Sequence, residues 1–200
     1  MSGRSVRKER ATKETTISVS LDVDGSGQVS VSTGLPFFDH MLAQLGRHSG
    51  FDLELVASGD LDVDAHHTVE DVGIILGEAL REALGDKAGV RRFGSVAVPL
   101  DEALVEVALD LSGRPYLAYG IDPGAGAEAL PLGNPPFDPQ LAEEFWRAFS
   151  TSAALTLHMS LRSGRNSHHI LEASFKAVAR ALADAVKREG KDVPSTKGTL

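Results

Sequence analysis

The chain of 200 residues contains no cysteine, which excludes disulfide bonds and thiolate metal sites within it. A chain without cysteine also fits a reducing compartment, so we expect a cytoplasmic protein. No apolar run approaches the ~18 residues that a membrane-spanning helix requires. The basic N-terminal segment is not followed by the apolar stretch of a secretory signal. The sequence therefore predicts no membrane partner.

An excess of positive charge is absent as well. Lys and Arg number 20 against 28 Asp and Glu, which gives a formal net charge of −8, so nucleic acid is not an expected partner. Any anion that the protein binds must be held by a local cluster of Lys and Arg. The apolar content of 42% and the charged content of 24% are ordinary for a globular protein.

Strand and helix patterns recur in the same order in the two halves of the chain. The first half predicts strands at 15–23 and 28–33 joined by a hairpin turn, a helix at 36–48, a strand at 51–59 and a helix at 69–84. The second half predicts two strands within 95–113, a helix at 138–153, a strand at 154–164 and a helix at 168–190. This order favours an α+β fold with two antiparallel-type sheets.

A pair of adjacent histidines followed by glutamate occurs once in each half. The segments are "HHTVE" and "HHILE", with His66, His67, Glu70, His168, His169 and Glu172. The chain has only seven histidines, so chance explains the match poorly. Pairing His66 with His168 also brings the flanking elements into the same order. An internal duplication is the simplest account, with halves 1–93 and 94–200 in one compact domain.

The residue types of these clusters suit divalent metals. Adjacent helical residues project about 100° apart, so the two imidazoles of a pair cannot easily serve one ion. They can serve two ions, or one ion and a substrate. Imidazole and carboxylate without sulfur are compatible with Mn, Fe, Zn and Ni, and less so with Mg and Ca. We therefore expect metals shared between the halves, or between subunits of a symmetric assembly.

Other polar residues could bind a substrate. His40, Gln44 and His48 are spaced by four and line one face of a predicted helix, although His48 could instead be a cation at the helix C-terminus. The donors that suit a phosphate group are Arg91, Arg92, Arg114, Lys176, Ser195, Thr196 and Lys197. Spacing alone does not join these donors, and each could equally be a solvated surface residue.

Several segments resemble the imidazoleglycerol-phosphate dehydratase family of histidine biosynthesis. They are "RATKET", "LPFFDHMLAQLGRHSGFDL", "DAHHTVEDVGI", "SGRPY", "GRNSHHILEASFKA" and "PSTKG", in that order over nearly the whole chain. The resemblance implies two four-stranded sheets with helices packed between them. It implies dehydration of D-erythro-1-(imidazol-4-yl)glycerol 3-phosphate to 3-(imidazol-4-yl)-2-oxopropyl phosphate. It also implies two Mn²⁺ ions per active site, and twenty-four subunits with active sites between them.

The resemblance also implies roles for individual residues. The metal ligands would be His40, His66, His67, Glu70, His168, His169 and Glu172. The substrate body would contact Glu14, Gln44 and His48, and the phosphate would be held by Arg92, Arg114, Lys176, Ser195 and Lys197. Glu14 and Glu172 are the candidates for proton transfer during catalysis. The family usually has a histidine where this chain has Glu144, which the duplication aligns with His40, so we expect a carboxylate ligand there.

Two other functions remain open from the residues alone. A histidine-rich, acidic and symmetric protein could be a metal store or a structural shell without catalysis. A hydrolase with the same metals is a weaker alternative, because no residue singles out a water nucleophile. The cationic residues discriminate between these functions, since a phosphorylated substrate needs Arg92, Arg114 and Lys197 beside the metal and a store does not.

Overall fold

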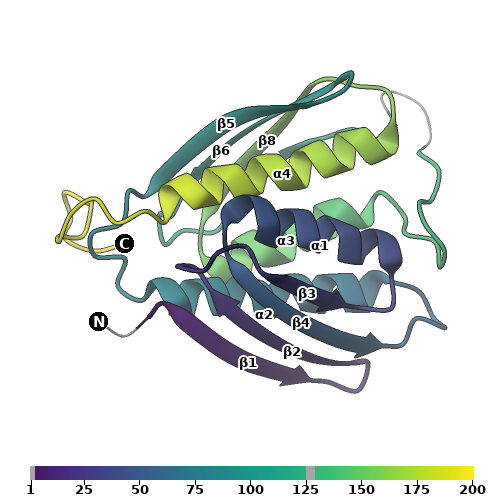
Figure 1. The fold of residues 1–200 in the computed structure, drawn as a ribbon, viewed down its shortest axis with the longest axis horizontal. Helices are drawn as coiled ribbons and strands as arrows, with labels where there is room; N and C mark the ends of the chain where they lie inside the picture. Colours follow the sequence, from purple (N-terminus) through teal and green to yellow (C-terminus); the bar gives the residue numbers. More distant parts are fainter. Residues whose placement is uncertain (1–2, 125–128) are drawn as a thin grey trace.

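The computed structural model describes residues 3–124 and 129–200, and within them two four-stranded sheets enclose four helices (Figure 1). The first half contains β1 (Ser5–Ala11), β2 (Thr15–Asp22), β3 (Val29–Ser32), α1 (Pro36–Ser49), β4 (Asp52–Gly59) and α2 (His66–Leu84). The second half contains β5 (Phe93–Leu100), β6 (Ala103–Asp110), β7 (Tyr116–Gly120), α3 (Leu141–Ala153), β8 (Thr156–Ser163) and α4 (Ser167–Ala185). The two halves repeat one order of elements, which confirms the α+β class and the duplication.

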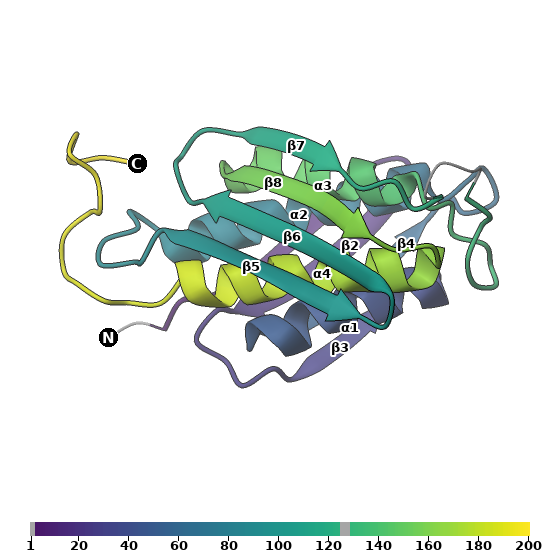
Figure 2. The same ribbon diagram turned by 90° about the horizontal axis from the view of Figure 1, so that it is seen from above.

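Strand pairing differs from the predicted hairpin between 15–23 and 28–33. The sheets have the orders β1-β2-β4-β3 (Figure 1) and β5-β6-β8-β7 (Figure 2), so β4 lies between β2 and β3. β3 pairs with β4 in parallel, and β7 pairs with β8 in parallel, while the other pairs are antiparallel. The hairpin prediction was therefore wrong, and both sheets are mixed rather than of the predicted antiparallel type. Asp52, at the start of β4, accepts hydrogen bonds from the amides of Ser26 and Gln28 at 2.8 Å each, which directs the turn onto β4.

The sequence did not predict two edge strands, β1 and β7. β1 is rich in charge, and the burial along it alternates only between exposed and half-buried. β7 is short and has no fully buried residue. Both properties are typical of edge strands, which avoid pairing with other chains by being short or charged. They also remove the strong apolar alternation that reveals a central strand such as β2.

The ends of three helices differ from prediction. α2 begins at His66 rather than at residue 69, α3 begins at Leu141 rather than at 138, and α4 ends at Ala185 rather than at 190. Local capping explains the start of α4, because the Asn166 side chain accepts hydrogen bonds from the amides of the first two histidines that follow. Both His-His pairs consequently lie in the first turn of a helix.

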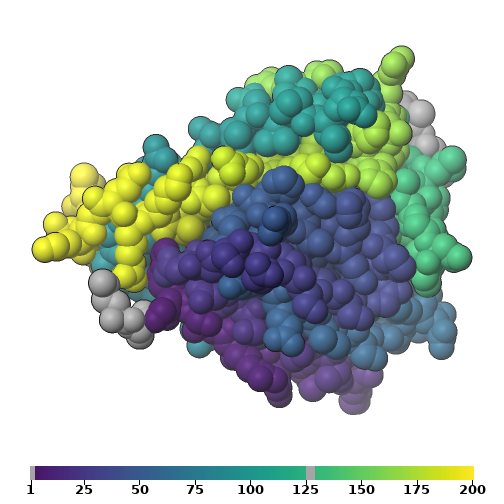
Figure 3. Space-filling model, in the orientation of Figure 1, coloured from purple at the N-terminus to yellow at the C-terminus, as the bar shows by residue number. Residues whose placement is uncertain are grey.

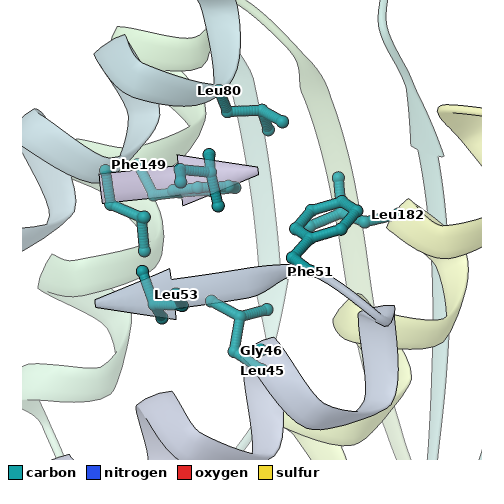
Figure 4. Close-up of a pocket in the computed structure, with 9 residues that line it drawn as sticks. Leu45, Gly46, Phe51, Leu53, Leu80, Phe149 and Leu182 are labelled. Carbon is teal, nitrogen blue, oxygen red and sulfur yellow. The ribbon is translucent and has the colours of Figure 1, made fainter. Parts of the chain in front are cut away.

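One hydrophobic core joins the halves. Apolar side chains of both sheets and all four helices are buried together. Gly73 and Gly77 let α2 approach α3 closely, because a Cβ atom at Gly77 would lie 2.6 Å from the carbonyl oxygen of Phe149. Figure 4 shows side chains of both halves converging on a cavity of about 10 Å³, with Leu53 from β4 and Leu182 from α4 among its lining. This volume is at the lower limit for one water molecule, so the core is well packed.

The shared direction of the helices gives the molecule two distinct ends. All four helices begin at the same end, on the right of Figure 1, and the C-terminal tail lies at the other end (Figures 1 and 3). None of the helices in the described residues is long and apolar enough to cross a membrane.

Candidate metal and substrate site

The predicted metal ligands gather at the end of the molecule where the helices begin. Each lies within the first two turns of its helix: His40 in α1, His66, His67 and Glu70 in α2, Glu144 in α3, and His168, His169 and Glu172 in α4. The sequence places at least one predicted ligand near the start of each helix. Only the parallel packing of the four helices brings these starts to one face.

The tightest group combines residues of both halves. One ligand atom from each of His40, His168 and Glu172 lies within 4.8 Å of the other two. Oε2 of Glu172 is 2.9 Å from Nε2 of His168 and 3.3 Å from Nε2 of His40. Two imidazole nitrogens and a carboxylate oxygen at such distances suit Mn²⁺ or a similar divalent ion.

Glu172 is strongly held in its ionised form. Burial alone would raise the pKa of Glu172, but contacts with Lys176, His168 and His40 outweigh this and lower its pKa to about 2. Nζ of Lys176 lies 2.7 Å from Oε1 of Glu172. Lys176, which was predicted to hold phosphate, lies beside the histidine cluster, and its ammonium balances the negative charge of Glu172.

The polar face of α1 forms a chain of contacts that leads to this cluster. Nδ1 of His40 is 3.4 Å from Nε2 of Gln44, and Oε1 of Gln44 is 3.1 Å from Nε2 of His48. Burial, followed by the charges of Lys176 and Arg180, lowers the pKa of His48. The lowered pKa favours the neutral form of His48, which does not support the alternative of a helix-terminal cation.

The two His-His pairs have the same geometry. The ring centroids of His66 and His67 are 6.2 Å apart with planes at 85°, and those of His168 and His169 are 6.2 Å apart with planes at 80°. The rings of each pair therefore diverge, as expected for adjacent residues on one helical turn. Each pair can reach two different ions or an ion and a substrate.

Two carboxylates that sequence reasoning missed contact the second histidine of each pair. Oδ2 of Asp60 lies 3.0 Å from Nδ1 of His67, and Oε2 of Glu102 lies 2.8 Å from Nδ1 of His169. These hydrogen bonds raise the pKa of both histidines, and the contact with His169 is the main cause that lowers the pKa of Glu102 to about 2. Glu102 is 67 residues from His169, and Asp60 is 7 residues before His67 but outside its helix, so no helix or strand periodicity joins these partners.

Glu14 and Glu144 occupy separate positions at the same end. Glu14 lies on the β1–β2 turn, with Oε2 3.9 Å from Nδ1 of His67. Glu144 and His66 line one cavity of about 510 Å³, together with Asp64 and Leu35. Oε2 of Glu144 is also 4.0 Å from Nε of Arg147. Both carboxylates therefore lie near the first His-His pair.

Four of the predicted phosphate residues meet in a different pocket. Arg92, Arg114, Ser195 and Lys197 line a cavity of about 600 Å³ against the C-terminal tail. Arg92 binds both carboxylate oxygens of Asp110, at 2.7 and 3.0 Å, and donates to the carbonyl of Pro194 at 2.8 Å. Arg92 thereby fastens the tail, while the guanidinium of Arg114 is largely exposed. Such a cationic pocket suits a phosphate group.

This pocket and the histidine clusters lie at opposite ends of one chain. The amide of Arg92 donates to the carbonyl of Ala185, the last residue of α4, whereas His168 is in the first turn of that helix. Seventeen residues at about 1.5 Å each place these ends about 25 Å apart. Lys176 lies between them on α4. A small phosphorylated molecule cannot span this distance within one chain.

The chain is similar to known proteins over almost its full length. A family model described as imidazoleglycerol-phosphate dehydratase matches residues 33–182. The imidazoleglycerol-phosphate dehydratase of Acidothermus cellulolyticus is 57% identical over 198 residues, covering 98% of this chain and 93% of that relative. The one from Parafrankia sp. is 53% identical over 199 residues, covering 98% and 99%. Among solved structures, IGPD from Pyrococcus furiosus in complex with (S)-C348 has a TM-score of 0.81 and 38% identity, covering 96% of this chain and 100% of that chain.

Proposed function

The chain belongs to the imidazoleglycerol-phosphate dehydratase family and is a hydro-lyase of histidine biosynthesis, and we propose that it works with two Mn²⁺ ions per active site. The observation that carries this proposal is the convergence of His40, His168 and Glu172 from two halves of the chain. Imidazole and carboxylate donors without sulfur fit this ion. We also propose that the protein is cytoplasmic, as expected for a cysteine-free biosynthetic enzyme.

The residues that would hold the metals are those at the starts of the helices. Besides the three residues of the tight cluster, they are His66, His67, Glu70, Glu144 and His169. A bound Mn²⁺ would act as a Lewis acid that lowers the pKa of the substrate's imidazole and assists loss of the hydroxyl group. The two diverging pairs, with their matched geometry, suit two ions better than one.

Two carboxylates were candidates for proton transfer, and their surroundings separate them. Oε2 of Glu172 lies 2.9 Å from Nε2 of His168 and 3.3 Å from Nε2 of His40, among the proposed metal ligands. We therefore assign Glu172 to metal binding. Glu14 is half-exposed and lies 3.9 Å from His67, so we assign it the removal of the proton from the carbon next to the one that loses hydroxide. Gln44 and His48 would contact the substrate body.

The phosphate of the substrate would lie in the pocket of Arg92, Arg114, Ser195 and Lys197. Charge-assisted hydrogen bonds there would orient the substrate without taking part in bond breaking. Lys176, beside Glu172, would join these phosphate contacts where the pocket of one subunit meets the histidines of another. A metal store has no use for such a pocket, so the pocket favours an enzyme over a storage shell.

A complete site requires more than one chain. The phosphate pocket is about 25 Å from the histidine ends along α4, so the pocket of one subunit must meet the histidines of another. A symmetric homo-oligomer satisfies this requirement, and the family resemblance sets the expected number at twenty-four subunits. Each subunit would then contribute to at least two active sites.

Activity of the metal-free protein tests the proposal. The protein is stripped with a chelator, and dehydration of D-erythro-1-(imidazol-4-yl)glycerol 3-phosphate is followed with and without added Mn²⁺. We expect no turnover without metal and full turnover after Mn²⁺ is restored. A metal-loaded protein that binds Mn²⁺ but leaves the substrate unchanged would instead be a storage shell.

A further inference from the structure

The second histidine of each pair is fixed by a carboxylate outside the predicted site. Nδ1 of His67 lies 3.0 and 3.3 Å from the two oxygens of Asp60, and Nδ1 of His169 lies 2.8 Å from Oε2 of Glu102. The same ring nitrogen is engaged in both halves. We propose that Asp60 and Glu102 are positioning residues that orient these histidines for metal binding, an inference that rests on the proposed metal-dependent function.

Hydrogen-bond chemistry determines which nitrogen is left for a metal. An ionised carboxylate only accepts hydrogen bonds, so Nδ1 must carry the proton. A neutral imidazole has a single N–H group, which leaves a lone pair on Nε2. For His169, the Nε2 atom is 3.8 Å from Asp101, beyond hydrogen-bond range. Asp60 and Glu102 therefore select the tautomer that can bind a metal through Nε2.

Glu102 is itself held rigidly. Its Oε1 atom accepts hydrogen bonds from the amides of Arg165 and Asn166 at 3.1 and 2.8 Å, just before α4 begins. Its other oxygen is thereby directed at His169, and the ring orientation becomes a property of the folded chain. A carboxylate that merely neutralised surface charge would not need both oxygens fixed.

The two halves reach this contact from different positions. Glu102 lies in the turn between β5 and β6, and the matching turn between β1 and β2 carries Glu14. Glu14 stays 3.9 Å from Nδ1 of His67, whereas Asp60, after β4, makes the close contact. The contact between a carboxylate and the second histidine is therefore not explained by the duplication alone. Asp60 orients His67 and leaves Glu14 available for the substrate.

The first histidine of each pair has no such partner on Nδ1 within the described residues. His168 instead directs Nε2 at Glu172, 2.9 Å away, and both atoms are proposed metal ligands. Their contact joins two proposed ligands of one site, while the contact of Glu102 with His169 occupies Nδ1 and leaves Nε2 as the nitrogen that would bind a metal. The contact of His168 with Glu172 therefore lies between two proposed ligands, whereas the contact of His169 with Glu102 orients one proposed ligand.

Asp60→Asn and Glu102→Gln test this role, because an amide keeps the shape but can also donate to Nδ1 and stabilise the other tautomer. The matched controls are Asp62→Asn, two residues along the same loop, and Glu106→Gln on β6. The tautomers of the full-length, metal-free protein are read from the Raman bands of neutral imidazole in alkaline buffer. The binding of Mn²⁺ alone is measured by calorimetry, and folding by thermal melting.

We expect each variant to convert one of the seven imidazoles from the Nδ1–H tautomer, and to bind Mn²⁺ about 10- to 100-fold more weakly. The controls should match the parent protein, and the melting temperatures should be unchanged. Unaltered tautomers overturn the proposal even if Mn²⁺ binding weakens, because the effect would then be structural. Neither the Raman measurement nor the calorimetry uses the substrate. A parent protein that fails to dehydrate the substrate would refute the proposed function, and the two measurements would still test the roles of Asp60 and Glu102.

Discussion

Arg92 and His168 lie at opposite ends of helix α4, about 25 Å apart. The amide of Arg92 is bound to the last residue of the helix, Ala185, and His168 lies in the first turn. Arg92 belongs to a cationic pocket and His168 to a histidine and carboxylate cluster. The proposed phosphate pocket and the proposed metal cluster of one chain therefore cannot act on the same substrate molecule.

This separation predicts complementation between inactive variants. Arg114→Ala damages the proposed phosphate pocket, and His168→Ala damages the proposed metal cluster. Mixed oligomers should regain activity, because some sites combine an intact pocket from one chain with an intact cluster from another. At equal mixing, at most about a quarter of the parental activity is expected. The variants are unfolded and refolded together, with mixing verified by native mass spectrometry, and mixed oligomers without activity would contradict a shared site.

Loss of a phosphate contact should weaken substrate binding without affecting the metal. Lys197→Ala removes an exposed ammonium from the pocket, so KM should rise about 10- to 100-fold while the Mn²⁺ content and melting temperature stay unchanged. Arg92→Ala should raise KM similarly but also lower the melting temperature, because Arg92 binds Asp110 and Pro194. Steady-state kinetics and calorimetric melting distinguish the two variants, and an unchanged KM in both would place the phosphate elsewhere.

Removal of a metal-binding imidazole should weaken metal binding and loosen the assembly. His67→Ala and His169→Ala each delete a proposed ligand, so Mn²⁺ should bind at least about tenfold more weakly and activity should be lost. His158→Ala is the matched control, because His158 is exposed on β8 and contacts Tyr116 instead. Elemental analysis and light scattering measure the outcome. Full Mn²⁺ occupancy in both ligand variants would refute the assignment.

Glu144 should determine which ion is preferred. A carboxylate in place of an imidazole supplies a hard oxygen, which favours Mn²⁺ over softer ions. Glu144→His should keep activity and shift the preference towards Zn²⁺ or Ni²⁺, and Glu144→Ala should lose affinity for one ion. Glu143→Ala, in the same turn of α3 and bound to Arg147, is the control. Unaltered metal stoichiometry in Glu144→Ala would show that Glu144 only solvates the helix.

The ionisation of Glu172 predicts how the stability of the metal-free protein depends on pH. Its pKa falls from the ordinary 4.5 to about 2 on folding, so its stabilising contribution is complete above pH 4.5 and disappears as the pH falls towards 2. The Glu172→Gln variant should lose less stability on acidification, because it lacks this contribution. Urea unfolding at several pH values measures the difference, with Glu54→Gln, exposed on β4, as the control. If the unfolding free energies of the parent and of Glu172→Gln fell in parallel with pH, the prediction would be contradicted.

The sequence by itself determined the fold class, the duplication and the residue types of the site. Hydrophobic alternation located the central strands, because such strands bury one face. It missed β1 and β7, which lie at sheet edges and lack that pattern. It also paired β2 with β3, because a short turn favours a hairpin when nothing shows that β4 will lie between them. The two histidine motifs and their glutamates were visible because the duplication repeats them.

Only the tertiary structure decided which of these residues meet. Packing the four helices side by side brings His40 of one half to Glu172 of the other, 132 positions away. The same packing places Lys176 beside Glu172, away from the pocket of Arg92 and Lys197 in the same chain. Asp60 and Glu102 carry no spacing signal, because their contacts with His67 and His169 arise from how a loop and a turn fold onto helix starts. Sequence patterns report local periodicity, whereas these contacts depend on the relative placement of elements that only the packed core fixes.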